Sequence, residues 1–126
     1  MVNGVKILLD TNAFIYFFEG RSKVTELLIQ TPIIYFSPIS EIELLSASQL
    51  TTQQFSQIKN FLSLCNPVEL TSDVVTTAIT IRRQYRFKTP DAIIAASALH
   101  LNVPLVSADT DFSKIEGMVL ITDILT

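Results

Sequence analysis

The chain has 126 residues, a length that suits one domain with one sizeable hydrophobic core. Hydrophobic residues make up 48% of the sequence and charged residues only 17%, which excludes an intrinsically disordered chain. The net charge of −3 excludes a general coat for nucleic acid, although a local basic patch or bound cations can still hold phosphates. Because so few charges leave apolar surface uncovered, we expect an oligomer or a complex.

No segment predicts a membrane span or an export signal. The most apolar stretch, residues 5–18, contains Lys6, Asp10 and Asn12, each of which is costly inside a bilayer. The same stretch lacks the small-residue cleavage site of a signal peptide. The single cysteine, Cys65, has no partner for an internal disulfide, which indicates a reducing compartment. We therefore predict a cytoplasmic protein without a membrane partner.

The first part of the chain alternates apolar runs with helical patterns. Residues 5–9 form a short apolar run that predicts a buried strand. Residues 14–18 then predict a first helix that ends at Gly20, and Ser22 is expected to cap a second helix. Pro32 breaks that second helix, and residues 33–36, which follow it, predict the second strand.

The middle of the chain predicts further helices around a weak strand. Ser40 is expected to open a third helix, and residues 51–54 match a capping box ahead of a fourth. Residues 66–70 predict a weakly marked third strand. Thr71 or Ser72 is then expected to cap a fifth helix, which ends in a basic stretch.

The last part of the chain completes the alternation. An alanine-rich helix is expected at residues 91–101, with Thr89 as its N-cap, Pro90 at its first position and Asn102 at its end. Strands are predicted at residues 103–106 and near 118–121, with a short turn between them. Strands that alternate with helices imply a parallel sheet covered on both faces. The whole sequence, residues 1–126, therefore predicts one α/β domain.

Four acidic residues stand where a predicted strand ends or a predicted helix or turn begins: Asp10, Glu43, Asp91 and Asp109. Each has a purely structural explanation. Asp10 and Asp109 can cap the helix or turn that follows them. Ser40 and Glu43 fit a capping box, and Asp91 stands in a first helical turn, where the helix dipole favours an acid. Capping alone therefore accounts for any one of these acids.

Capping does not require the four acids to converge. In an open parallel sheet, the cleft lies at the carboxyl ends of the strands, where the strand order reverses. If the first and fourth strands are neighbours there, Asp10, Asp91 and Asp109 gather at one spot, and Glu43 leans over it. Clustered carboxylates raise one another's pKa, a cost that a divalent cation removes. Oxygen ligands favour Mg²⁺ or Mn²⁺, which activate water toward phosphorus, so the pattern predicts phosphodiester hydrolysis.

Four segments resemble, in order, the motifs of the PIN domain family: LLDTN at 8–12, SPISEIELL at 37–45, KTPDAIIAA at 88–96 and LVSADTDF at 105–112. The small size further resembles VapC-type toxins, the ribonuclease halves of bacterial and archaeal toxin–antitoxin pairs. The resemblance implies a three-layer α/β/α sandwich around a parallel sheet, here of four or five strands. It also implies RNA cleavage dependent on Mg²⁺ or Mn²⁺, and a homodimer silenced by a cognate antitoxin.

The same motifs imply residue roles. The catalytic acids would be Asp10, Glu43, Asp91 and Asp109. Asp10, Asp91 and Asp109 would bind the metal, with Asp111 as an auxiliary ligand. Asn12 and Ser107 match polar positions that orient the acids or the attacking water. Glu43 is preferred over Glu41 because Leu44 follows it as in the family motif, and two acids about 200° apart on a helix cannot face one metal.

The basic residues before Asp91 and the single histidine can each be explained in two ways. Before Asp91 comes a basic stretch made of Arg82, Arg83, Arg86 and Lys88. It is either a solvated helix end, where the dipole favours cations, or a contact for RNA phosphates. His100 stands at a helix end, where packing or the dipole explains it better than catalysis.

Three alternative functions have their own sequence requirements. A phosphoacceptor receiver domain needs paired acids after the first strand and an aspartate after the third, and both are missing. Haloacid dehalogenase relatives need Asp-x-Asp, which Asn12 interrupts. An inactive PIN-fold module that binds RNA or protein remains open, although the four acids argue against it.

Overall fold

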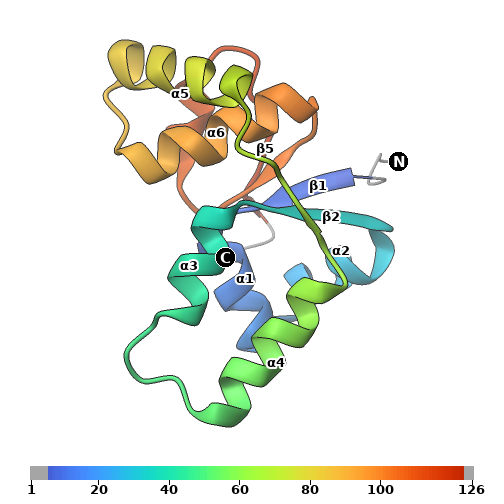
Figure 1. Cartoon of the computed structure of the whole chain (residues 1–126). Helices are drawn as coiled ribbons and strands as arrows, with labels where there is room; N and C mark the ends of the chain where they lie inside the picture. Colours follow the sequence, from blue (N-terminus) through green and yellow to red (C-terminus); the bar gives the residue numbers. More distant parts are fainter. Residues whose placement is uncertain (1–5, 124–126) are drawn as a thin grey trace.

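Five short segments pair into one parallel sheet. The computed structural model describes residues 6–123, so residue 5, expected in the first strand, lies outside the described part. The strands are β1 (Lys6–Leu9), β2 (Ile33–Phe36), β3 (Asn66–Pro67), β4 (Leu105–Val106) and β5 (Leu120–Ile121). Their order is β3-β2-β1-β4-β5, and every neighbouring pair is parallel. The sheet lies between helices on both sides, which confirms the predicted α/β sandwich (Figure 1).

Each face of the sheet carries its own hydrophobic core. Successive side chains of a strand point to opposite faces, so Leu8 joins one core while Ile7 and Leu9 join the other. All three side chains are buried. Continuous apolar strands of this kind are typical of parallel sheets covered on both sides.

Two helices, α5 (Ser72–Tyr85) and α6 (Thr89–Leu101), cover the face to which Leu8 points, and they lie above the sheet in Figure 1. Much of α6 is buried, because it packs against α5 as well as belonging to the core on this face. Small side chains on α6 permit close packing: Ala92, Ala95, Ala96 and Ala98 are all fully or almost fully buried. The predicted alanine-rich helix is therefore confirmed.

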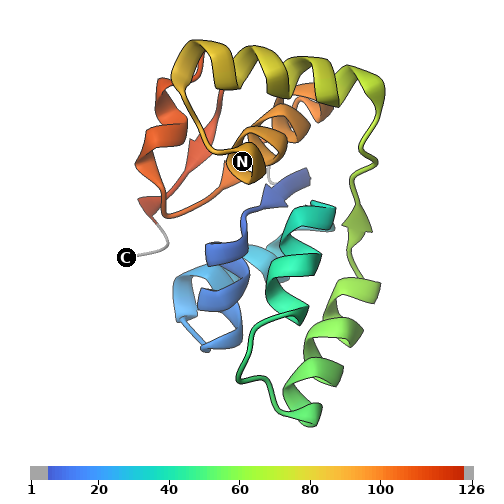
Figure 2. The same cartoon turned by 60° about the vertical axis from the view of Figure 1, so that its left-hand side comes forward.

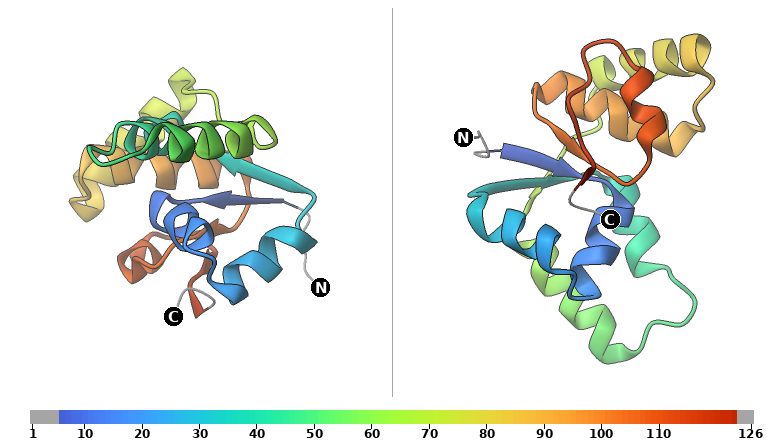
Figure 3. Two further views of the ribbon diagram at one scale, coloured as in Figure 1. Left: turned by 90° about the horizontal axis from the view of Figure 1, so that it is seen from below. Right: turned by 180° about the vertical axis from the view of Figure 1, so that it is seen from behind.

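The opposite side of the sheet is covered by α1 (Thr11–Phe18), α2 (Ser22–Gln30), α3 (Pro38–Leu45) and α4 (Thr52–Ser63). Seen from below, α1 lies between α2 on one side and α3 with α4 on the other (Figure 3). Phe61 of α4 packs against α1, with its ring centroid 4.6 Å from that of Phe17 and 6.3 Å from that of Phe14. None of the helices in residues 6–123 has the length and hydrophobicity needed to cross a bilayer.

The chain order places the strand reversal between β1 and β4. From β1 the chain builds outward through β2 and β3, and the segment from α4 through β3 to α5 runs along that edge from one helix layer to the other (Figure 2). It then returns to add β4 on the other side of β1. The predicted neighbourhood of the first and fourth strands is thus confirmed, with Leu9 opposite Val106.

The predicted start of the third helix is wrong. Helix α3 begins at Pro38, and Ser37 caps it by accepting a hydrogen bond from the Ile39 backbone N–H at 3.1 Å. Proline suits the first helical position because it has no N–H to satisfy there. The capping box expected for Ser40 and Glu43 is therefore not formed.

Two other helix starts also differ from expectation by one residue. Arg21, not Ser22, occupies the cap position of α2, and Lys88, not Thr89, occupies that of α6. Neither side chain makes a capping hydrogen bond. In contrast, the capping box at residues 51–54 and the Thr71 cap are confirmed.

Several elements have bounds that differ from the predictions. Helix α1 begins at Thr11 rather than residue 14, because the Asp10 carboxylate caps it. Strand β4 starts only at Leu105, since Pro104 has no N–H for the ladder. Strands β3 and β5 contain two residues each, fewer than expected. After β3 one more backbone bond, from Val68 N–H to the Phe36 carbonyl at 2.9 Å, follows before the chain turns toward α5.

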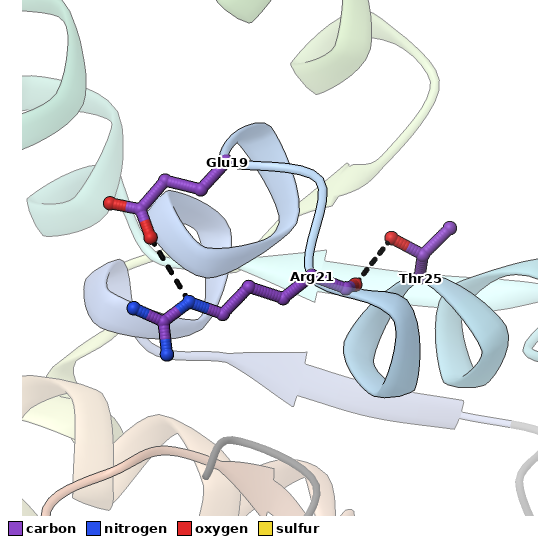
Figure 4. A network of polar contacts seen from close by, with 3 residues as sticks. All are labelled: Glu19, Arg21 and Thr25. Atoms are coloured by element: carbon purple, nitrogen blue, oxygen red, sulfur yellow. Dashed lines mark hydrogen bonds and ion pairs between the residues drawn. The ribbon is translucent and has the colours of Figure 1, made fainter.

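The corner between α1 and α2 is held by a compact polar network (Figure 4). Gly20 has a positive φ of 81°, a conformation that glycine adopts without strain. Arg21 donates from Nε to Glu19 Oε1 at 3.1 Å, and its carbonyl accepts from Thr25 Oγ1 at 2.8 Å. The Arg21 guanidinium also lies 3.9 Å from the ring centroid of Tyr16. These contacts give Arg21 a structural role at the corner.

Candidate active site

The end of β1 fixes the first acid in both its backbone and its side chain. Asp10 donates its backbone N–H to the Val106 carbonyl of β4 at 2.9 Å. Its side chain caps α1, because Oδ1 accepts from the Thr11 N–H at 2.8 Å. The residue is only 5% exposed. The capping role is therefore present, and it leaves the second carboxylate oxygen for other partners.

Residues that follow β1 and β4 share a largely buried hydrogen-bond network around that second oxygen. Ser107 Oγ donates to Asp10 Oδ2 at 2.7 Å, and Asn12 Nδ2 approaches the same oxygen at 3.3 Å. Asn12 Oδ1 accepts from the Ala108 N–H at 3.0 Å, which ties the start of α1 to the end of β4. Ser107 Oγ also accepts from the Asp109 N–H at 3.0 Å. The network orients the Asp10 carboxylate in one direction.

The other strand-end acids flank this network. Asp109 caps the short 3₁₀ helix η1 (Thr110–Lys114), with Oδ1 accepting from the Asp111 N–H at 3.0 Å. Asp91 lies in the first turn of α6, where the positive end of the helix dipole favours it. Each acid thus has the local role that its sequence position suggests, and each also belongs to the same end of the sheet.

Electrostatic coupling shows that four carboxylates lie near one another. Burial raises the pKa of Asp10, and the negative charges of Asp91 and Glu43 raise it further. Hydrogen bonds from Ser107 and Thr11 oppose this rise. Burial also raises the pKa of Asp91, with added repulsion from Asp109 and Glu43, although Lys88 opposes it. We call Asp10, Glu43, Asp91 and Asp109 the acidic cluster.

Glu43 reaches the acidic cluster from α3 through a contact that sequence reasoning missed. Thr11 Oγ1 donates to Glu43 Oε1 at 2.5 Å, and the same hydroxyl lies 2.9 Å from Ser40 Oγ. Thr11 belongs to the LLDTN motif, which was the only sign of its importance in the sequence. Ser40 was expected as a helix cap and instead faces α1.

Two nearby acids stand apart from the cluster. Asp111 is exposed and forms an ion pair with Lys114 at 3.2 Å. Its backbone N–H donates to Asp109 Oδ1, yet its charge is not among those that raise the pKa of Asp10 or Asp91. Glu41 likewise perturbs neither group.

The basic stretch divides into engaged and free side chains. Arg82 Nε donates to the Phe87 carbonyl at 3.1 Å, which closes the end of α5. Lys88 lies near enough to Asp91 to lower its pKa. Arg83 and Arg86 are exposed, and Arg86 adopts a left-handed conformation with φ of 61°. His100 is exposed at the end of α6.

The acidic cluster has the ligand atoms of a metal site, but its side chains do not converge on one point. Four carboxylates at one spot form the oxygen-rich set that suits hard divalent cations. Within residues 6–123, however, no three His, Cys, Asp or Glu side chains converge closely enough to hold a metal ion. The Asp10 and Glu43 carboxylates accept hydrogen bonds from Ser107 and Thr11 instead. Side-chain rotation would be needed to complete a metal site.

An apolar groove of about 320 Å³ adjoins the acidic cluster at Glu43. It lies between α1, α3 and α4, and Glu19 provides a second acid at its wall. Its apolar lining includes Ile15, Phe18, Leu44, Ala47, Leu50 and Ile58. Ile15 and Phe18 remain 42% and 36% exposed, so part of the expected uncovered apolar surface lies here.

Several solved structures with the same fold come from toxin–antitoxin systems. A chain in a toxin–antitoxin complex from Klebsiella pneumoniae is 29% identical, with a TM-score of 0.80 over 92% of this chain and 96% of the other. One in VapBC-1 from nontypeable Haemophilus influenzae is 25% identical, with a TM-score of 0.77 over 93% and 97%. One in VapBC2 from Rickettsia felis, bound to a promoter DNA fragment, is 23% identical, with a TM-score of 0.80 over 93% and 98%.

No curated protein sequence matches the chain. A family model does match it, however, over nearly the whole described region. The matching model is that of the PIN domain, and the match runs from residue 7 to residue 118. The match includes all four members of the acidic cluster and the network of Asn12 and Ser107. The chain therefore belongs to the PIN domain family, as its four motifs suggested.

Proposed function

We propose that this protein is an endoribonuclease that hydrolyses RNA phosphodiester bonds with Mg²⁺ or Mn²⁺, and that it is the toxin of a type II toxin–antitoxin pair. The observation that carries the proposal is the acidic cluster at the strand reversal between β1 and β4. Burial and the neighbouring negative charges raise the pKa of Asp10 and of Asp91, and such a gathering of carboxylates is costly unless a cation neutralises it. Membership of the PIN domain family supports the same reading.

The residues divide the work as follows. Asp10, Asp91 and Asp109 would hold the cation, with Asp111 as an auxiliary ligand and Glu43 completing the acidic wall. A bound divalent cation supplies activation of water and neutralises charge that develops on the phosphate. Asn12 and Ser107 fix the direction of the Asp10 carboxylate. All seven of these acids and polar residues stand at positions that match the family motifs.

RNA phosphates are expected to lie against the basic stretch next to Asp91. Arg83 and Arg86 are exposed and have no ion pair within residues 6–123, so their guanidinium groups are free to bind phosphate. Lys88 stands beside Asp91 and could place a phosphate near the cluster. Arg82 is a weaker candidate, because it already binds the Phe87 carbonyl.

A cognate antitoxin is the proposed protein partner, and a homodimer is the proposed state of the toxin. The Klebsiella pneumoniae and Haemophilus influenzae chains with this fold come from toxin–antitoxin structures. The apolar groove beside Glu43 is a suitable place for an apolar segment of an antitoxin, and its acids Glu19 and Glu43 favour a basic residue within that segment. We expect the protein to meet both partners, the antitoxin and a second copy of itself, in the cytoplasm.

The alternative is an inactive PIN-fold module that binds RNA or protein. The observation in its favour is the lack of three converging metal-binding side chains within residues 6–123. Such a module would keep the groove and the basic stretch but would show no dependence on metal.

The test is cleavage of a structured RNA pool by purified protein in Mg²⁺, in Mn²⁺ and in EDTA. Asp10→Asn should fold and lose metal-dependent cleavage by at least about hundredfold, since a catalytic carboxylate is lost. Asp73→Asn is the matched control, because Asp73 is an exposed acid in the first turn of α5. Cleavage by wild type and by Asp73→Asn alone would support the proposal. Equal cleavage by Asp10→Asn would indicate a contaminating nuclease, and no cleavage in any metal would favour the inactive module.

A further inference from the structure

The hydroxyl of Thr11 occupies an unusual place between two helices and two acids. Thr11 opens α1, and its backbone N–H donates to Asp10 Oδ1 at 2.8 Å. Its side-chain Oγ1 lies 2.5 Å from Glu43 Oε1 and 2.9 Å from Ser40 Oγ, both on α3. Thr11 therefore touches two members of the acidic cluster, one through its backbone and one through its side chain.

The direction of these hydrogen bonds follows from counting protons. A threonine hydroxyl has one hydrogen to donate, and an ionised carboxylate can only accept. The Thr11 hydrogen must therefore go to Glu43, and Ser40 must donate to the Thr11 oxygen. This gives a directed chain from Ser40 through Thr11 to Glu43. Because Ser40 is fully buried, water cannot reach it to reverse the chain.

Without these hydrogen bonds, the Glu43 side chain is expected to move away from the acidic cluster. It is an exposed side chain at the rim, and the charges of Asp10 and Asp91 repel it. Thr11 holds only Oε1, and Oε2 makes no hydrogen bond within residues 6–123, so it remains available to a ligand. A hydrogen bond to a charged acceptor is among the stronger ones, so it can offset this repulsion.

We propose that Thr11 is a positioning residue that holds Glu43 over the acidic cluster, with Ser40 setting the direction of its hydroxyl. The inference rests on the proposed nuclease function and deepens it. Thr11 acts through Glu43 and does not itself contact the substrate. Asp10 and Thr11 are adjacent in the sequence, at the start of α1. The first turn of α1 therefore links the acid at the end of β1 to the acid of α3.

The experiment compares Thr11→Val with Thr11→Ser. Valine has the shape of threonine without the hydroxyl, whereas serine restores it. Thr80→Val is the matched control, because the Thr80 hydroxyl bonds only the Thr76 carbonyl on α5. Three quantities are measured for each: kcat and KM for RNA with Mn²⁺, Mn²⁺ affinity by calorimetry without RNA, and the melting temperature.

Thr11→Val should lose about tenfold to hundredfold in kcat, the range expected for one hydrogen bond to a charged group. KM for RNA should stay within about twofold, since the basic stretch is untouched. Mn²⁺ affinity should fall as well, and Thr11→Ser should recover most of both losses. Thr80→Val should match the wild type. In Glu43→Gln, adding Thr11→Val should cause no further loss of Mn²⁺ affinity, because Thr11 acts through Glu43.

Three outcomes would overturn the inference. The first is wild-type kcat and Mn²⁺ affinity in Thr11→Val, and the second is a loss of Mn²⁺ affinity that adds fully to that of Glu43→Gln. The third is a loss that Thr11→Ser does not recover. Should Thr11→Val not fold, Ser40→Ala is measured in its place. It removes the hydrogen bond that Thr11 accepts and leaves the one to Glu43, so a few-fold loss of kcat and of Mn²⁺ affinity is expected, and no loss at all would overturn the inference. A wild-type protein that neither cleaves RNA nor binds Mn²⁺ would overturn the proposed function as well, whereas a cleaving wild type with an unaffected Thr11→Val would overturn only the role of Thr11.

Discussion

The acidic cluster has two sides that are built differently. The inner side, made of Asp10, Asn12 and Ser107, lies where β1 and β4 end, and its hydrogen bonds involve backbone N–H groups as well as side chains. The outer side, made of Thr11, Ser40 and Glu43, depends on a single chain of hydroxyls that ends on an exposed carboxylate. Sheet pairing thus holds one side, and two side chains hold the other.

This difference implies different tolerance to change. The Asp10 backbone cannot move without breaking its bond to Val106, and its carboxylate cannot turn without losing the hydrogen bonds from Thr11 N–H and Ser107. A carboxylate held by one hydroxyl can swing when a cation or a partner enters, and the present geometry requires such movement to complete a metal site. We expect the inner side to set the position of the cluster and the outer side to adapt.

The two sides should differ most in the loss of kcat that a serine-to-alanine substitution causes, Ser107→Ala on the inner side and Ser40→Ala on the outer side. Ser107→Ala removes the donor to Asp10 Oδ2 and the acceptor for the Asp109 N–H. Leaving such buried groups unpaired removes about 1–3 kcal/mol of the free energy that holds the Asp10 carboxylate in its position. We therefore expect kcat to fall about tenfold to hundredfold. Ser40→Ala should cost only a few-fold, since Glu43 keeps the Thr11 hydroxyl. Single-turnover RNA cleavage measures both, and equal losses would erase the distinction between the sides.

A smaller effect is expected in the pH dependence of stability without metal. The raised pKa of buried Asp10 means that the folded protein holds this proton to higher pH than the unfolded chain does. Stability therefore falls as pH rises from the ordinary aspartate pKa of about 3.9 to the raised folded value, with a slope of at most about 1.4 kcal/mol per pH unit for each proton. Asp10→Asn should lack this component, so its stability relative to wild type should increase across that window.

Urea unfolding in EDTA between pH 4 and 8 measures this difference, because titrations shared by the two proteins cancel. Adding Mn²⁺ should restore the stability of the wild type and leave Asp10→Asn largely unchanged. A stability difference that does not vary with pH would contradict the raised pKa of Asp10.

The smallest effect is expected for Glu41→Gln, as a contrast with Glu43→Gln. The two acids stand two residues apart on α3, and only Glu43 contacts Thr11 and perturbs Asp10. Glu41→Gln should change kcat by less than about twofold and remove at most a few tenths of a kcal/mol of favourable interaction with the helix dipole. RNA cleavage and thermal melting check this. A large loss of activity in Glu41→Gln would place the wrong acid of α3 in the outer side.

Local patterns were enough to predict most elements of the fold. The apolar run before Asp10 and the alanine-rich helix after Asp91 each have a periodicity or composition with one structural meaning, and the strands and helices form near the expected places. Helix starts were harder, because Ser37 and Ser40 are both good caps, and Pro38 decides between them by fitting the first helical position. The ends of β3, β4 and β5 depend on pairing partners rather than on their own sequence.

The amino-acid sequence by itself determined the order of the strands and helices and placed an acid at the end of β1, at the start of α6 and after β4. Only the tertiary structure decided which of these ends meet. Asp10 and Ser107 are separated by 97 positions yet form a buried hydrogen bond, and Thr11 reaches Glu43 across 32 positions. Such contacts follow from the pairing of β1 with β4 and the packing of α1 on α3. Those arrangements are set by burial summed over the whole chain, which no local periodicity records.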